Sequence, residues 1–189
     1  MTLKPAQSDT DLLNRLAAGD ALAMKAFFAR HQAKVFRFSM RLLKDNMAAE
    51  DLTNEVFMRV WQRADSFRGQ AAVSTWLLSI ARNMALSRLR KRSEETLGEG
   101  QSEALVDDAD TPEILAQKAS KGEAIKLCIA KLSAEHQEII DLVYYHEKSV
   151  REVGEVVGIP DATVKTRMFY ARKQLAELMR DHGIDRGWP

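Results

Sequence analysis

The chain has few of the residues that interrupt or cross-link a fold: its 189 residues include 9 glycines, 4 prolines and one cysteine. Scarce glycine and proline, together with 46% apolar residues, favour a globular and mostly helical protein over a disordered or all-β one. A lone cysteine excludes an internal disulfide. We interpret Cys128 as a buried structural thiol, because it lies on an apolar helical stripe.

Long apolar runs are also missing. No run approaches the roughly 18 residues that span a bilayer, and the first residues, MTLKPAQSDTD, lack the apolar core of a signal peptide. The histidines are scattered without metal-ligand spacing: His31, His136, His146 and His182. These absences predict a cytoplasmic protein with no metal site and no cofactor.

Charge is distributed unevenly along the chain. Residues 1–92 hold 16 Lys and Arg against 8 Asp and Glu, residues 93–124 hold 2 against 9, and residues 125–189 hold 10 against 10. The overall net charge of +1 therefore conceals a basic first half and an acidic middle. Such an asymmetry suits a polyanionic ligand and an acidic connector.

The acidic middle separates two predicted domains, 1–92 and 111–189. Between them, residues 93–110 contain two glycines and neither aromatics nor helical periodicity, so we predict a flexible acidic linker. The second domain is expected to begin at Thr111, where Thr-Pro-Glu suits a helix N-terminus. Both domains are predicted to be small and all-α, because helical periodicity recurs and no segment of the first domain alternates like a strand.

Four helices are predicted in the first domain. Asp9 and Asp20 are expected to cap the first two. The third is expected at about 48–63 and the fourth at about 74–92. The apolar stripe of the fourth, predicted to pack inward, consists of Leu77, Ile80, Ala81 and Met84.

The fourth helix also carries a mixed stripe of a ring, an amide, a hydroxyl and a guanidinium: Trp76, Asn83, Ser87 and Arg90. The loop before it adds Phe67 and Arg68. This combination suits single-stranded DNA, because bases stack on rings, amides contact base edges and cations contact phosphates. The alternative is an ordinary helix edge with a half-buried tryptophan and solvated polar groups.

The second domain contains a helix-turn-helix pattern. One helix is predicted at 113–131, and Ser133 is expected to cap the next. Gly158 permits a left-handed turn, and Asp161 can cap a final helix. A turn of this kind before a charged helix is typical of proteins that bind duplex DNA.

The final helix has two predicted faces. Its core face consists of Val164, Met168, Ala171, Leu175 and Leu178, and its outward face of Lys165, Thr166, Phe169, Tyr170 and Lys173. The outward side chains suit a major groove, where a lysine can donate to guanine and an aromatic can contact a thymine methyl. Arg167, Arg172 and Lys173 suit phosphates. The alternative is that Phe169 packs beneath a neighbouring helix and the cations form a solvated face.

Segments in both predicted domains resemble a known family. AAEDLTNEVFMRVWQRADSFRG and STWLLSIARNMALSRLRKR resemble region 2 of the sigma-70 family, in its extracytoplasmic-function (ECF) subgroup. LSAEHQEIIDLVYYHEKSVREVGEVVGIPDATVKTRMFYARKQL is similar to region 4 of that subgroup. The resemblance implies a non-enzymatic subunit that binds bacterial RNA polymerase, directs the polymerase to −35 and −10 promoter elements and assists promoter melting. The genes transcribed are expected to form a stress or envelope regulon.

The resemblance also implies partners and sites. An anti-sigma protein is expected to bind the chain. The linker is expected to lie in the RNA exit path of the polymerase; the alternative is that the linker is only a solubilising tether. The residues implied to contact the polymerase, which otherwise form a solvated face, are Glu50, Asp51, Leu52, Asn54, Glu55 and Phe57. Those implied to contact the unpaired −10 element are Phe67, Arg68, Gly69, Trp76, Asn83, Ser87 and Arg90. Those implied to contact the −35 duplex are Thr163, Lys165, Thr166, Arg167, Phe169, Tyr170, Arg172 and Lys173. Tyr170 departs from the arginine or histidine often found at its position.

Two other function classes stay open. A free-standing helix-turn-helix regulator would bind duplex DNA as a dimer, although no dimerisation heptad is evident. A helical enzyme would need convergent catalytic groups, and the sequence offers no suitable pairing of nucleophile and base.

Overall fold

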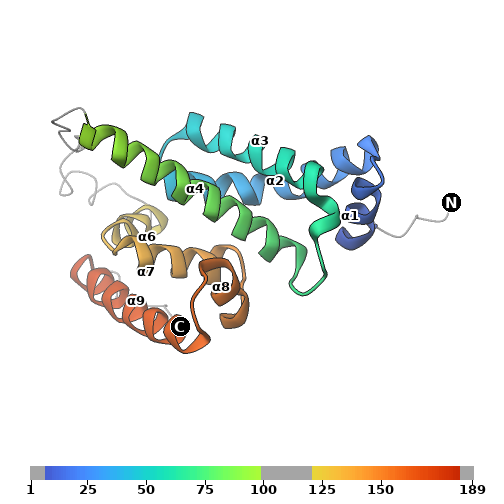
Figure 1. Ribbon diagram of the computed structural model, residues 1–189. Helices are drawn as coiled ribbons and strands as arrows, with labels where there is room; N and C mark the ends of the chain where they lie inside the picture. Colours follow the sequence, from blue (N-terminus) through green and yellow to red (C-terminus); the bar gives the residue numbers. More distant parts are fainter. Residues whose placement is uncertain (1–6, 99–120, 184–189) are drawn as a thin grey trace. The chain divides into compact units, whose positions relative to one another are not determined.

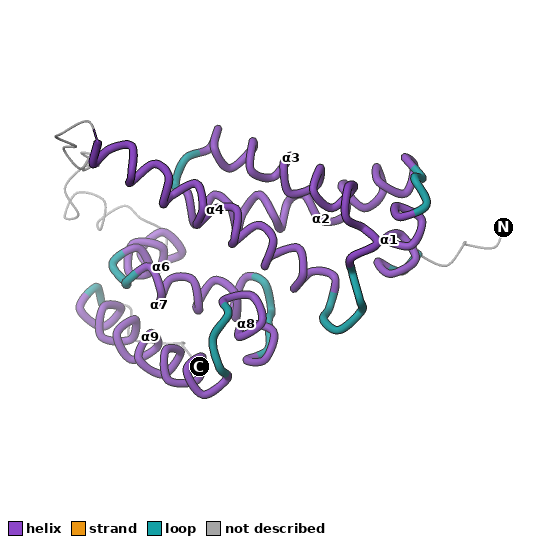
Figure 2. Tube along the Cα trace, viewed as in Figure 1, coloured by secondary structure: helices purple, strands orange, loops and turns teal. Residues whose placement is uncertain are grey.

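The computed structural model describes residues 7–98 and 121–183 (Figure 1). Within these ranges the regular elements are helices and no strand is present (Figure 2), which confirms the predicted all-α class. The chain divides into two compact units, and the main division falls between Glu95 and Thr96. The helices of residues 7–98 are called the N-terminal unit and those of residues 121–183 the C-terminal unit. No helix among the described residues has both the length and the apolar character needed to cross a membrane.

The N-terminal unit contains the four predicted helices and a 3-10 turn, η1: α1 (Asp9–Ala17), α2 (Ala21–Leu43), α3 (Asn46–Arg63), η1 (Ala64–Ser66) and α4 (Val73–Gly98). α4 continues beyond its predicted end at Arg92, into the first residues of the predicted linker. Ion pairs one turn apart accompany the extension, at 3.9 Å between Arg90 and Glu94 and 3.7 Å between Lys91 and Glu95. The predicted linker beyond Gly98 lies outside the described residues.

The first two helices begin at polar caps. Asp20 caps α2 as predicted, because its carboxylate accepts two backbone N–H groups of the first turn at 2.9 and 3.1 Å. α1 is capped by Ser8 and not by Asp9, which corrects the prediction. The Ser8 hydroxyl accepts from the N–H of Asp11 at 3.1 Å and the Asp11 carboxylate accepts from the N–H of Ser8 at 3.3 Å, a reciprocal capping box.

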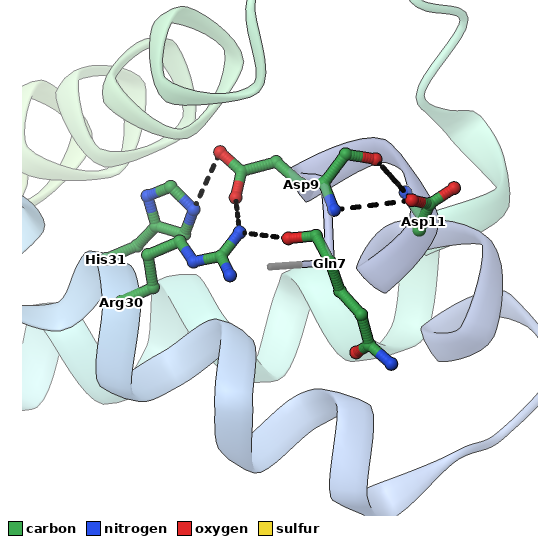
Figure 3. Close-up of polar contacts among 6 residues, drawn as sticks. Gln7, Asp9, Asp11, Arg30 and His31 are labelled. Carbon is green, nitrogen blue, oxygen red and sulfur yellow. Dashed lines mark hydrogen bonds and ion pairs between the residues drawn. The ribbon is translucent and has the colours of Figure 1, made fainter. Parts of the chain in front are cut away.

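Asp9 instead joins α1 to α2 (Figure 3). Its carboxylate oxygens lie 2.6 Å from Arg30 Nη1 and 3.1 Å from His31 Nε2. Arg30 Nη1 also donates to the backbone carbonyl of Gln7 at 2.9 Å. These contacts supplement the apolar packing of α1, whose buried leucines are Leu12, Leu13 and Leu16.

Aromatic rings fill the core of the N-terminal unit. Phe27 and Phe57 are buried with ring centroids 6.2 Å apart, and Phe28 lies 4.8 Å from Phe57. The buried residues of α4 include Leu77 and Ala81, as predicted, but also Leu78 and Ala85, whereas Ile80 and Met84 are only partly buried. The inward face of α4 is therefore rotated relative to the predicted stripe.

The C-terminal unit contains four helices and a π-helical turn, η2: α6 (Lys121–Ala130), α7 (Ala134–Ile140), η2 (Asp141–Tyr145), α8 (Val150–Val157) and α9 (Asp161–Asp181). Ser133 caps α7 as predicted, since its hydroxyl accepts from the N–H of His136 at 3.3 Å. One apolar cluster joins α6, α7 and α9: Cys128, Ile129, Leu132, Ile140, Ala171, Leu175 and Met179. The buried Cys128 is confirmed. The expected start at Thr111 and the helix at 113–120 lie outside the described residues.

A tight turn connects α8 to α9. Gly158 has φ +76°, the left-handed conformation predicted for it. α9 begins at Asp161 itself, after Pro160 in the capping position, so the prediction that Asp161 is the cap is wrong. Val164, Ala171 and Leu175 are buried as predicted, while the remaining core-face residues, Met168 and Leu178, are half-buried.

Candidate functional site

Of the α3 residues predicted to contact the polymerase, some lie on the surface and others are buried in the core. Glu50, Asp51, Asn54 and Glu55 are exposed. Leu52 and Phe57 are 0% and 2% exposed, so they pack inside the unit and do not present a surface to a partner. The contact surface predicted from the sequence is therefore reduced to its four polar members, with the two apolar residues holding α3 in place.

Two exposed methionines extend the polar row. Met47 is 75% exposed and Met58 is 58% exposed, and spacings of three and four residues place both on the helix face of Asp51 and Asn54. Sequence reasoning missed them, although apolar residues at helical spacing within a polar face were a usable signal. Beside this face a groove of about 460 Å³ lies between α2 and α3, lined by Phe28, Gln32, Ala33, Phe36, Glu50, Thr53 and Asn54.

Arg88 of α4 is attached to the same helix. Its guanidinium lies 2.7 Å from the Glu55 carboxylate and donates to the carbonyl of Ala48 at 3.0 Å. Asn46 donates to Glu50 at 3.0 Å. Two of the four exposed carboxylate and amide groups therefore have intramolecular contacts that fix their positions on α3.

Phe67 and Trp76 come together at the start of α4. Their ring centroids are 5.2 Å apart with planes inclined at 52°, and both side chains are half-buried. Gly69, with φ +68°, turns the loop between them, and Arg68 beside it is exposed. The structure thus groups the aromatic residues predicted to contact the −10 element.

The polar members of this predicted site continue along α4. Asn83, Ser87 and Arg90 are exposed, and their spacing of three and four residues keeps them on one side of the helix. Arg90 makes the 3.9 Å pair with Glu94, with both side chains largely in solvent. Exposed pairs of this kind are weak, so the guanidinium can exchange Glu94 for a phosphate at small cost.

The outward face of α9 is exposed as predicted. Phe169 and Tyr170 are 64% and 54% exposed, and their rings meet edge to face at 5.4 Å. Lys165, Thr166 and Lys173 are exposed around them, while Thr163 is half-buried. Phe169 therefore does not pack beneath a neighbouring helix, which was the alternative interpretation of this face.

Arg167 and Arg172 of α9 are each held by another element. Arg167 lies 3.2 Å from the Glu135 carboxylate of α7. Arg172 Nε donates to the Tyr144 hydroxyl of η2 at 2.8 Å, and its guanidinium carbon lies 5.6 Å from the Tyr144 ring centroid. Sequence reasoning missed both partners, because no periodicity connects residues on separate helices.

Comparisons with known proteins match both units to one family. The Sigma-70 region 2 model matches residues 27–95 and the Sigma-70 region 4 model matches residues 128–177. The chain is 31% identical over 176 residues to the ECF RNA polymerase sigma factor SigL of Mycobacterium tuberculosis, covering 90% of this chain and 96% of that protein. This chain is an ECF sigma factor of the sigma-70 family. It is also 30% identical to SigW of Bacillus subtilis, over 89% of this chain and 95% of SigW.

Solved structures agree with this assignment. The sigma factor RpoE of Bartonella quintana, in complex with the anti-sigma factor NepR, has a TM-score of 0.68 and 29% identity, covering 86% of this chain and 98% of RpoE. CnrH, solved with the cytosolic domain of CnrY, shares the fold at a TM-score of 0.66 and 20% identity, covering 93% of this chain and 99% of CnrH.

Family membership decides between the function classes. An ECF sigma factor initiates transcription with RNA polymerase and binds promoter DNA, and it is not an enzyme. Neither the free-standing regulator nor the helical enzyme fits this family. α1 lies before residues 27–95, which the Sigma-70 region 2 family model matches. The family model therefore does not cover this helix.

Proposed function

We propose that this sigma factor reads the −35 element as duplex DNA with α9 and captures the unpaired −10 element on α4 and the loop before it. The observation that supports the proposal is that each unit has a pair of contacting aromatic rings, half-buried at the start of α4 and exposed on α9, beside exposed cations and polar side chains. Phe169 and Tyr170 lie among exposed lysines on α9. The Phe67 and Trp76 pair lies at one end of an exposed polar stripe on α4.

On α4, a base released from the duplex would stack against the Trp76 ring. Unstacking a base costs a few kcal/mol, and stacking on an aromatic side chain returns about 1–3 kcal/mol per base. Asn83 and Ser87 would contact base edges, while Arg68 and Arg90 would contact phosphates. Gly69 would let the loop backbone approach the strand closely.

On α9, Lys165 and Thr166 would contact base edges in the major groove, and Phe169 would contact a thymine methyl. Lys173 and Arg172 would hold phosphates. Thr163, near the start of the helix, and Tyr170 would lie beside the backbone of the DNA. Arg167 is less suited to a phosphate, because the Glu135 carboxylate already neutralises it.

The exposed row on α3 is the proposed contact with the polymerase. By analogy with the family, this helix would dock on the clamp helices of the largest polymerase subunit. The acidic and amide groups suit a basic partner surface, and Met47 and Met58 add apolar contacts at the two ends of the row. The division of the chain into region 2 at 1–92, a linker at 93–110 and region 4 at 111–189 is part of this proposal.

Regulation by a protein that occludes these surfaces is a further part of the proposal. RpoE and CnrH were solved in complexes with an anti-sigma factor and with the cytosolic domain of CnrY, respectively. A partner of the anti-sigma class would keep this chain from the polymerase until a signal releases it. The chain would then act in the cytoplasm, where the polymerase and the chromosome are.

Transcription with purified core RNA polymerase and fragments of the source genome tests the proposal. We expect the chain to bind the core and to start transcription from a subset of the fragments. Asp51→Asn should weaken core binding, whereas Asp181→Asn, at an exposed acid at the end of α9, should not. The proposal fails if the chain neither binds core polymerase nor starts transcription from any fragment.

A further inference from the structure

We infer that Tyr144 is a positioning residue for promoter binding, which holds the Arg172 guanidinium ready for a DNA phosphate. The inference rests on the proposed function of α9 as the reader of duplex DNA. It adds a residue outside the helix-turn-helix to that site and gives it a role distinct from packing.

Tyr144 joins the core to the DNA-binding face. Its ring packs against the apolar cluster of the C-terminal unit, which includes Cys128 and Leu175. Its hydroxyl accepts the Nε–H of Arg172 at 2.8 Å, and the guanidinium also lies over the ring. A partly buried ring has few rotamers available, so an exposed arginine attached to it at two points loses much of its own freedom before DNA arrives.

Arg172 lies where a phosphate contact is useful. Lys165, Phe169 and Arg172 follow one another at spacings of four and three residues and form one stripe of α9. The bond to Tyr144 uses Nε–H, which is one of the five donors of the guanidinium. The two terminal nitrogens have the planar fork geometry that binds a phosphate through two parallel hydrogen bonds.

The chemistry of the group that holds each side chain distinguishes Arg167 from Arg172. Glu135 is a carboxylate, so the pair with Arg167 cancels the positive charge. Tyr144 is a neutral phenol and leaves the full charge of Arg172 for the DNA. Since each phosphate contact releases about one counterion, Arg172 should contribute to the salt dependence of binding more than Arg167 does.

The test is binding of holoenzyme, assembled from the full chain and core polymerase, to a duplex that the wild-type holoenzyme selects from a random-sequence library. We expect Tyr144→Phe to weaken binding about 3- to 10-fold, which is the size of effect that loss of one ordinary hydrogen bond has. Arg172→Ala should weaken it further and reduce the slope of log K against log salt by about 1. In the Arg172→Ala background, Tyr144→Phe should have no additional effect.

Two controls separate positioning from folding. Tyr144→Phe retains the ring, so the thermal unfolding midpoint of the full chain should stay unchanged. Tyr145→Phe removes the neighbouring hydroxyl, which belongs to a 52% exposed side chain, and should leave DNA affinity unchanged. The inference is overturned if Tyr144→Phe leaves DNA affinity unchanged, or if it lowers the affinity equally in the wild-type and Arg172→Ala backgrounds. It is also overturned if Tyr145→Phe lowers the affinity as much as Tyr144→Phe does. Failure of the wild-type holoenzyme to select any duplex would instead overturn the proposed function.

Discussion

Phe67 and Trp76 form an inclined ring pair, with centroids 5.2 Å apart, that closes the loop between η1 and α4. The pair places an aromatic platform at the end of the polar stripe of Asn83 and Ser87. A single ring on a mobile loop would lose more conformational freedom on binding a base than a ring already packed against a second one. The pairing therefore gives the proposed −10 surface a rigid element.

The first prediction concerns promoter opening. Trp76→Ala should reduce the open-complex equilibrium constant about 5- to 100-fold, because stacking of a base on an aromatic contributes about 1–3 kcal/mol. Phe67→Ala should cause a smaller reduction, since it removes the support of the Trp76 ring. Permanganate reactivity of unpaired thymines measures the effect.

The control for this prediction is Trp61, a half-buried tryptophan of α3 that is outside the proposed −10 surface. Trp61→Phe should leave permanganate reactivity unchanged, and Trp76→Ala should retain wild-type affinity for core polymerase. If Trp76→Ala abolishes core binding, the proposed division of surfaces in the N-terminal unit is wrong.

The second prediction concerns −35 recognition. Lys165→Ala should relax the base preference at one or two positions of the element, because a lysine donating to a guanine edge discriminates by about 1–3 kcal/mol. Selection from a randomised promoter library measures the preference. Lys173→Ala, proposed to contact phosphate, should instead weaken binding to all sequences alike. An unchanged library profile for Lys165→Ala would remove that residue from the base-reading set.

The faces of α9 were predictable from the sequence because one repeating angle determines them. Val164, Ala171 and Leu175 recur at helical spacing, so their burial leaves Phe169 and Tyr170 outside. The same argument was less successful on α4, where several apolar residues lie on adjacent stripes and only packing against other helices selects the buried one.

Contacts between distant residues were not predictable. Ser8 and Asp9 are both good capping residues, and the choice between them depends on Arg30 and His31, which α2 brings to Asp9. The contact of Tyr144 with Arg172 depends likewise on the packing of η2 beside α9. Neither local propensity nor periodicity contains that information.

The third prediction concerns the turn before α9. Gly158→Ala should destabilise the C-terminal unit by about 1–2 kcal/mol, because a residue with a Cβ is strained at φ +76°. A Cβ there meets no atom within 4 Å, so steric contact adds nothing. Urea unfolding of the full chain, followed by hydrogen exchange in α9, measures the loss. Gly158→Asn should be milder, since asparagine tolerates this conformation better, and an Asn variant as unstable as the Ala variant would contradict the explanation.

The fourth prediction concerns α1. Leu16 is 2% exposed, and Leu16→Ala should cost about 2–5 kcal/mol of unfolding free energy, as deletion of a buried leucine side chain does. Leu22 is 75% exposed at the start of α2, and Leu22→Ala should change stability by less than about 0.5 kcal/mol. Equal effects in urea denaturation would show that α1 is not part of the cooperative unit.

The last prediction concerns pH. Burial lowers the pKa of His31 more than the neighbouring Asp9 carboxylate raises it, and the cations Arg30 and Lys34 lower it further. His31 is 5% exposed and lies against the Phe27 ring, with centroids 4.7 Å apart, so the neutral imidazole is the form that fits the core.

The direction of the pH effect follows from this pKa shift. The unfolded chain takes up a proton on His31 at about pH 6.5, whereas the folded chain does so only at lower pH. The unfolded state therefore binds more protons in this window, and stability should fall as pH decreases from 7.5 to 5.5.

His31→Gln removes the titrating group and should flatten this part of the curve of stability against pH. Urea midpoints of both chains at each pH provide the measurement. A wild-type slope in His31→Gln would assign the pH dependence to another group.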